Sequence, residues 1–170
     1  MKNDFIAIID SGIGGISVLN EFIDAHVDAR FLYFGDNDNV PYGNKSDEQL
    51  FNIVSANIDY IKKYNVKALV IGCNTLSVSL YKEIKDYASM ATFGVFPPVK
   101  QIIQNGEESI LLATQKTAQK YEGIQNLTTI GLSELAKEIE EKKFSLKEID
   151  FSHHLRGLKN VKDHYDNVIL

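Results

Sequence analysis

Short runs of Ile, Val, Leu and Phe recur along the chain and alternate with stretches of helical spacing. The runs are FIAII (5–9), FLYF (31–34), ALVI (68–71), SILLA (109–113), LTTI (127–130) and NVIL (167–170). After the first run, one helical face carries Val18, Leu19, Phe22 and Ile23; after the second, one face carries Leu50, Ile53, Val54, Ile58 and Ile61. Strands that are apolar throughout, alternating with amphipathic helices, are typical of a parallel sheet covered on both faces. The sequence therefore predicts an α/β fold with right-handed crossovers.

A pair of prolines marks a division near the middle of the chain. Pro97 and Pro98, in the stretch GVFPPVK (94–100), are excluded from a helix interior and favour an extended crossing segment. Three strand–helix units precede this stretch, and a smaller set follows it. We therefore expect two similar α/β subdomains with parallel sheets flanked by helices, residues 1–96 and residues 97–170.

Two helix starts carry the pattern of a capping box, a serine followed three residues later by Gln or Glu. The pairs are Ser46 with Gln49 and Ser145 with Glu148. A helix is expected to begin directly after each serine.

Composition excludes several classes of function. The net charge is −5, and the 18 Lys and Arg residues are scattered, so we expect no nucleic-acid partner. The N-terminal apolar run has five residues, which is too short for a signal peptide or a membrane span. The chain is therefore expected to be cytoplasmic, with no membrane partner. A single cysteine excludes an intrachain disulfide and a Cys-rich zinc site.

Polar residues follow the first three apolar runs, at the edge where open parallel sheets bind ligands. The three following stretches are DSGIGG, GDNDNVPYG and GCNT. By topology they should bring together Asp10, Ser11, Asp36, Asn37, Asn39, Tyr42, Cys73, Asn74 and Thr75.

The first two stretches also have purely structural interpretations. In DSGIGG, bare amides at a helix start could receive an anion, or the glycines could only permit a tight turn while Asp10 or Ser11 caps the helix. GDNDNVPYG suits almost any turn. Asp36 and Asp38 have no third carboxylate at fitting spacing, so no metal is expected.

Cys73 is the residue of this edge with the most reactive chemistry. Most single cysteines in cytosolic chains are packing residues, but this one follows a buried strand and precedes a helix expected near Leu76. Helix-end amides can stabilise a thiolate there. Acyl transfer would call for a histidine base, and His26, His153, His154 and His164 all lie outside the three loops. Proton transfer by the thiol fits better.

Taken together, IIDSGIGGISVL, YFGDNDNVPYG and VIGCNTLS resemble the N-terminal half of the glutamate racemases of the aspartate/glutamate racemase family. These are cofactor-independent enzymes that supply D-glutamate for peptidoglycan in bacterial cell walls. The resemblance continues more loosely through GVFPP (94–98), LLATQKTAQKY (111–121) and LAKEIEE (135–141).

The resemblance implies a two-domain isomerase whose active site lies between the domains and uses no cofactor. Two cysteines on opposite faces of the substrate Cα exchange the roles of base and acid. Cys73 would be the catalytic thiol that takes the proton from the D-enantiomer of an acidic amino acid, glutamate or aspartate. Residues 1–96 would then carry the first catalytic half-site. The substrate-binding positions implied are Asp10, Ser11, Tyr42, Gly43, Asn74 and Thr75.

The sequence also departs from the family pattern. The second cysteine belongs to a Gly-Cys-Thr-His motif expected after DNVIL, where this chain ends at Leu170. We therefore expect a chain truncated before that motif, with an incomplete second subdomain. Smaller departures are Asn39 in place of the usual arginine, Pro97 in place of a glutamate, and Lys120 within a usual Ser-to-Tyr pattern.

Two functions follow from this departure. One is a glutamate racemase-like protein, and the other is an inactive relative that binds an acidic amino acid or a protein partner. A final strand without its following helix leaves one sheet face uncovered. A dimer partner, a swapped element or a continuation of the chain could cover it, and a homo-oligomer is favoured if the 170 residues are complete.

Overall fold

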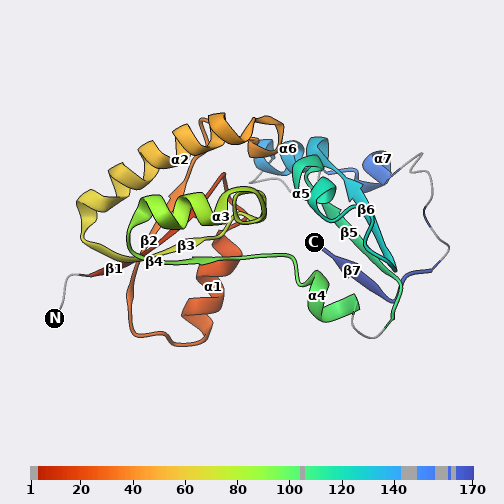
Figure 1. Ribbon diagram of the computed structural model, residues 1–170, viewed down its shortest axis with the longest axis horizontal. Coiled ribbons are helices and arrows are strands. Elements are labelled where there is room, and N and C mark those ends of the chain that lie inside the picture. Colours follow the sequence, from red (N-terminus) through yellow and green to blue (C-terminus); the bar gives the residue numbers. More distant parts are fainter. Residues whose placement is uncertain (1–3, 104–105, 143–148, 156–160, 162–163) are drawn as a thin grey trace. The chain divides into compact units, whose positions relative to one another are not determined.

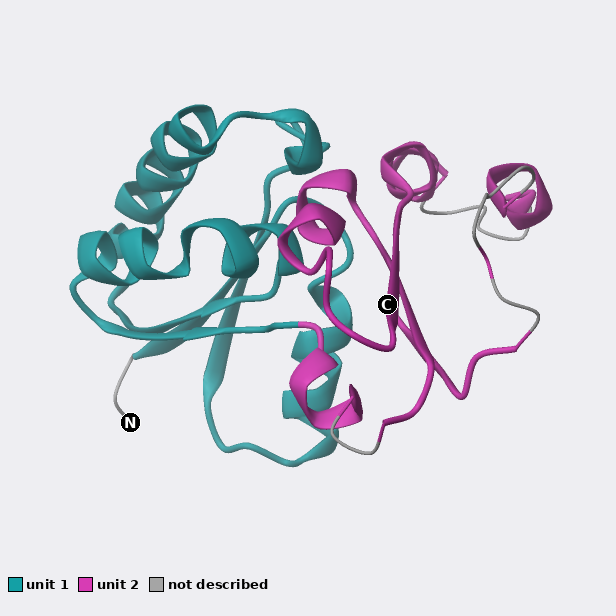
Figure 2. Cartoon of the chain, turned by 45° about the vertical axis from the view of Figure 1, so that its right-hand side comes forward, with its two compact units in different colours: residues 1–96 teal, residues 97–170 magenta. Residues whose placement is uncertain are grey.

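The computed structural model describes residues 4–103, 106–142, 149–155, 161 and 164–170. The chain divides into two compact units, Met1–Phe96 and Pro97–Leu170, coloured teal and magenta in Figure 2. Each unit has its own parallel sheet with flanking helices. The α/β fold predicted from the alternating runs is confirmed.

The first unit is built on a four-stranded parallel sheet in the order β2-β1-β3-β4 (Figure 1). The strands are β1 (Phe5–Asp10), β2 (Arg30–Gly35), β3 (Val66–Ile71) and β4 (Ala91–Gly94). In register, Asp10 lies beside Gly35 and Ile9 beside Ile71. The carboxyl ends of the first three strands therefore meet at one edge.

The edge strand β4 was not among the predicted strands. Its sequence, ATFG, has no apolar run, because only alternate residues face the interior. Thr92 is buried, whereas Phe93 leaves 60% of its surface exposed. An edge strand of four residues with one large apolar side chain gives no run that could be read from the sequence.

Helices cover the two faces of this sheet unequally. In Figure 1, α1 (Ile16–Asp24) lies on one side, and α2 (Asp47–Ile61) and α3 (Asn74–Ala88) lie on the other. The apolar stripe of α2 is confirmed, since its fully buried residues are Leu50, Val54, Ile58 and Ile61. Short 3-10 turns occur at Tyr42–Asn44 (η1) and Lys62–Tyr64 (η2).

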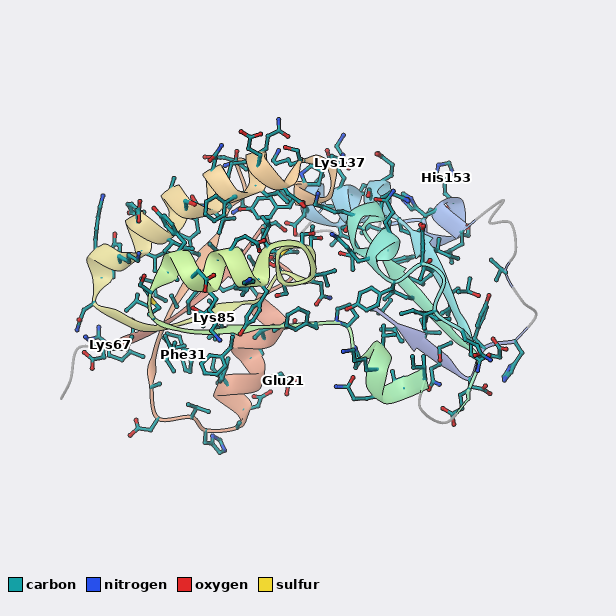
Figure 3. All side chains as sticks on the ribbon, viewed as in Figure 1. Glu21, Phe31, Lys67, Lys85, Lys137 and His153 are labelled. Atoms are coloured by element: carbon teal, nitrogen blue, oxygen red, sulfur yellow. The ribbon has the colours of Figure 1, made fainter. Side chains whose placement is uncertain are left out.

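Helix α1 is less deeply packed than its spacing predicts. Phe22 packs on Phe31 of β2 with ring centroids 5.4 Å apart, and Figure 3 labels Phe31 beside this helix. Ile23, expected on the same face, is 54% exposed. No residue of α1 is fully buried, because this short helix lies alone on its side of the sheet.

The predicted capping box at the start of α2 is confirmed. Ser46 Oγ accepts a hydrogen bond from the Gln49 N–H at 3.1 Å, and Gln49 Oε1 accepts one from the Ser46 N–H at 2.9 Å. Both bonds satisfy amides that the helix itself leaves without partners.

Replacing Ser46 with alanine is expected to lower the free energy of unfolding by about 1 kcal/mol, because the Gln49 amide loses its side-chain acceptor. Urea denaturation followed by circular dichroism measures this change. The exposed Ser17 of α1 makes its bond to the carbonyl of Gly14 and caps no amide, so Ser17→Ala serves as the control. Equal stability losses in the two variants would contradict the capping role.

The second unit has a three-stranded parallel sheet in the order β6-β5-β7. Its elements are α4 (Val99–Ile102), β5 (Ser109–Ala113), α5 (Gln115–Lys120), β6 (Leu127–Gly131), α6 (Ser133–Glu141), α7 (Phe151–Leu155) and β7 (Asn167–Ile169). Its core is small, centred on Val99, Leu111 and Ile169. The predicted capping box of Ser145 and Glu148 lies outside the described residues.

The two prolines lie outside the helices, as predicted, and a short helix follows them directly. Pro98 is the N-cap of α4, which begins at Val99. Proline immediately before a helix is compatible with helix formation because its missing N–H would have no intrahelical partner there.

Across the described ranges, no helix combines the length and the apolar character that crossing a membrane requires.

Candidate functional site

The loops that follow β1, β2 and β3 are tied together by backbone hydrogen bonds. The Asp36 N–H donates to the Asp10 carbonyl at 3.0 Å, and the Gly72 N–H donates to the Ile9 carbonyl at 2.9 Å. The parallel register thus continues past the strand ends into the polar stretches. The predicted site residues therefore come from neighbouring loops of the first unit.

The first loop folds around the carboxylate of Asp10, which is 4% exposed. Its Oδ2 accepts a hydrogen bond from the Gly12 N–H at 2.9 Å, and the Gly12 carbonyl accepts one from Tyr33 Oη at 2.7 Å. Gly15 is the N-cap of α1 and has no side-chain cap. The interpretation in which Asp10 or Ser11 caps this helix is therefore wrong, because the Asp10 carboxylate accepts from its own loop.

Close approach explains the glycine at position 15. A Cβ there would lie 2.8 Å from the Cβ of Asp10 and 3.2 Å from Tyr33 Oη. The helix start is thus packed directly on the Asp10 side chain, which leaves that carboxylate little freedom to move.

The second loop is organised by Asp36, which is 6% exposed. Its Oδ2 accepts from Tyr42 Oη at 2.6 Å and from Asn57 Nδ2 at 2.9 Å. Its Oδ1 accepts from Asn39 Nδ2 at 2.9 Å. Neutral donors therefore satisfy this carboxylate.

The Tyr42 phenol is 2% exposed, and Gly43 follows it in the same 3-10 turn. Burial, followed by the hydrogen bond to Asp36, raises the pKa of Tyr42 far above its usual range, and the charges of Cys73 and Asp10 also contribute. The hydroxyl of Tyr42 is therefore committed to Asp36.

The third loop places Cys73 at the N-cap of α3, which begins at Asn74, two residues earlier than predicted. Its Sγ donates to Ser11 Oγ at 3.9 Å. Burial raises the pKa of Cys73 to about 11, and the negative charge of Asp10 adds to the rise. The N–H groups of Leu76 and Thr75 and the Ser11 hydroxyl act in the opposite direction. The thiol is therefore protonated at neutral pH.

The residues after Cys73 supply polar groups at the same helix start. Asn74 Oδ1 is buried and has no hydrogen-bond partner within the described part of the chain. Thr75 is 4% exposed. A buried amide oxygen without a donor is costly and is suited to accept an N–H from a ligand.

The arrangement can carry a proton. Among the described side chains, no group of three or more His, Cys, Asp or Glu residues is placed to hold a metal. A protonated thiol beside a hydroxyl and a buried carboxylate can donate a proton, and it can accept one after ionisation.

The alkylation rate of Cys73 by iodoacetamide is expected to rise about tenfold per pH unit between pH 7 and 10, without a plateau below about 11. The reason is that only the thiolate reacts and a raised pKa keeps its fraction small throughout this range. Cys73 is the only cysteine, so mass spectrometry of the intact chain measures it directly.

Asp10→Asn is expected to speed alkylation at pH 8, because it removes a negative charge that raises the thiol pKa. Asp4→Asn is the control, since Asp4 directly precedes β1 at the opposite end of the strand.

For the pH profile of the wild type, a plateau of the alkylation rate near pH 8.5 would contradict the raised pKa of Cys73.

Sequence reasoning missed the supports of the site. Asp36 was predicted to lie at this edge, but its bonds to Tyr42 and Asn57 were not predicted, and Tyr33 and Asn57 were not considered. Asn57 carried a usable signal, because it lies on the helical stripe that runs from Val54 to Ile61, where a polar residue among apolar ones needs a partner. Tyr33, inside an apolar run, carried none.

Known proteins similar in sequence share one description. Glutamate racemase from Clostridium acetobutylicum is 36% identical over 120 residues, covering 69% of this chain and 47% of that protein. Glutamate racemase 1 from Caldanaerobacter subterraneus subsp. tengcongensis is 38% identical over 122 residues, covering 69% and 44%. The chain spans about half the length of these curated relatives. No protein-family model matches it.

Solved structures agree with the sequence relatives. Glutamate racemase from Campylobacter jejuni superimposes with a TM-score of 0.80 at 25% identity, covering 96% of this chain and 70% of that one. Escherichia coli glutamate racemase, solved in complex with L-glutamate and the activator UDP-MurNAc-ala, gives 0.76 at 28% identity, covering 98% and 68%.

Proposed function

This chain belongs to the glutamate racemase family, and on that premise we propose that its first unit carries one proton-transfer half-site for glutamate. Cys73 is the group that removes and returns the Cα proton of the D-enantiomer. The observation that carries the proposal is the thiol's position: a buried N-cap of α3 whose Sγ donates to Ser11 Oγ and lies within the field of Asp10.

The chemistry is a reversible proton transfer. The Cys73 thiolate takes the Cα proton, and the C–H electron pair stays on the substrate, delocalised into its carboxylate. The thiol then exchanges its proton with solvent and returns a proton to the same face. One thiol can therefore exchange the Cα hydrogen with retention, whereas inversion needs a second acid on the opposite face.

The neighbouring groups are proposed to favour ionisation of the Cys73 thiol when substrate is bound. Asn74 Oδ1, which lacks a donor within the described residues, accepts a hydrogen bond from the substrate ammonium. A positive charge beside Cys73 favours its ionised form and offsets the burial that keeps its pKa near 11 in the free protein.

The other substrate-binding positions implied by the family resemblance are also proposed to contact the substrate, each through the groups that its hydrogen bonds leave available. The ring of Tyr42 and the backbone of Gly43 line the substrate, because the phenol hydroxyl is taken by Asp36. Ser11 and Thr75 supply hydroxyls, and the Asp10 carboxylate faces the thiol. Glutamate and aspartate differ by one methylene, so the shape of the pocket determines which of them is preferred.

The test is proton exchange in D2O. The 170-residue chain is incubated with D-glutamate, and the Cα proton signal is followed by NMR. Loss of the signal above the protein-free rate is the expected result. An unchanged signal, at D-glutamate concentrations that raise the melting temperature, would overturn the proton-transfer role.

A second candidate is an inactive relative that binds an acidic amino acid. The thiol pKa of about 11 favours it, because a protonated thiol can line a pocket without removing a proton. Thermal stabilisation by D- or L-glutamate without any exchange would identify this function. A cytoplasmic location and a homo-oligomer stay predictions; gel filtration with light scattering measures the latter.

A further inference from the structure

We propose that Asn57 of α2 is a positioning residue for this site: it holds Asp36, and through Asp36 it fixes Tyr42 within the buried cluster that also contains Cys73. The inference rests on the proposed function for its kinetic consequence, but the geometry it assigns is independent of that function. Asn57 lies outside the three loops, fifteen residues beyond Tyr42 in the sequence.

The connection passes through a single oxygen atom. Asp36 Oδ2 accepts from Asn57 Nδ2 at 2.9 Å and from Tyr42 Oη at 2.6 Å. Helix α2 is anchored in the core by Leu50, Val54, Ile58 and Ile61, so Asn57 projects from a rigid element. The second loop, by contrast, has only short 3-10 structure of its own. The helix therefore supplies the fixed end of the connection.

Asp36 depends on neutral donors, which are Asn39, Tyr42 and Asn57 among the described residues. The carboxylate is 6% exposed, and no described Lys, Arg or His side chain pairs with it. A buried carboxylate that loses a donor must find another or move toward water. Without Asn57, Asp36 is expected to turn outward and to release the phenol of Tyr42.

Tyr42 and Cys73 belong to the same cluster of buried residues, with exposed fractions of 2% and 6%. The Ser11 hydroxyl accepts a hydrogen bond from the thiol, the Asp10 carboxylate of β1 raises the thiol pKa, and Tyr42 of η1 lies in the same buried cluster. Since burial is the main cause of the raised thiol pKa, a displaced Tyr42 should lower that pKa.

The test compares Asn57→Leu with Asn52→Leu. Both change asparagine to leucine on α2, but Asn52 is exposed, whereas Asn57 donates to Asp36. Asn57→Leu is expected to speed iodoacetamide alkylation of Cys73 at pH 8 about tenfold, which corresponds to a thiol pKa lower by one unit. It is also expected to raise KM for D-glutamate exchange more than it lowers kcat. Asn52→Leu should leave both quantities unchanged.

Asn57→Gln keeps the amide donor and is expected to restore part of the wild-type alkylation rate. If Asn57→Leu does not fold, Asn57→Ala is measured in the same way, since it removes the donor without adding apolar bulk. Alkylation profiles identical to wild type in the folded Asn57 variant, or equal changes in the Asn52 and Asn57 variants, would overturn the proposal. Absence of exchange in the wild type would reject the proposed function and leave the alkylation result as the test of the positioning role.

Discussion

Replacing Cys73 with serine is expected to reduce the Cα exchange of D-glutamate by at least about 10³-fold. A thiol ionises within the range of aqueous pH, whereas an alcohol does not, so the serine can neither take nor return the proton at a useful rate. The hydroxyl is smaller than the thiol and can still bond to Ser11, whose Oγ accepts from the Cys73 thiol at 3.9 Å in the wild type.

Binding provides the control for this variant. Because Asn74, Thr75 and the first loop are unchanged, Cys73→Ser should still be stabilised by D-glutamate to the same extent as the wild type. Thermal melting measures that stabilisation, and NMR in D2O measures the exchange. Exchange by Cys73→Ser at the wild-type rate would remove the thiol from the mechanism.

Gly15→Ala is expected to lower the free energy of unfolding by about 1–3 kcal/mol and to slow exchange as well. The Cβ of the new alanine would lie 2.8 Å from Asp10 Cβ, an atom fixed to strand β1 that cannot rotate away. Backbone conformation is not the cause, because Gly15 has φ of −67°, which alanine adopts readily. The strain must therefore displace either the helix start or the carboxylate that faces Cys73.

Gly14→Ala is the matched control, one residue away in the same loop. A Cβ at position 14 would have Asp10 Oδ2 as its nearest neighbour at 3.7 Å, which is ordinary van der Waals contact. Its effect on stability should stay within about 0.5 kcal/mol. Urea denaturation of the two variants decides the question, and similar losses in both would contradict close packing as the reason for glycine at position 15.

The fold could be predicted from the sequence wherever burial leaves a run of apolar residues. The central strands β1 and β3 are covered on both faces, so their sequences contain continuous apolar runs. The apolar stripe of α2 likewise indicates that this helix packs on the sheet. The edge strand β4 has no such run because Phe93 faces outward. Ile23 shows the converse, an apolar residue at helical spacing that stays 54% exposed.

The candidate site could be predicted as far as topology determines it. The rule that parallel strands present their carboxyl ends at one edge was enough to gather Asp10, Tyr42 and Cys73. The pairings within the site could not be predicted, because they depend on side-chain directions that no spacing reveals. Asp36 could have bound a cation, capped a turn or, as the structure has it, accepted bonds from Tyr42 and Asn57.

In the proposed function, one thiol works on one face of the substrate. This is tested by the ratio of the Cα deuteration rates of D-glutamate and L-glutamate in the presence of the wild-type chain, with the configuration of each product determined by chiral chromatography. We expect D-glutamate to be deuterated with retention and L-glutamate to exchange at least about 10²-fold more slowly. Equal deuteration of both enantiomers, or none of either, would contradict it.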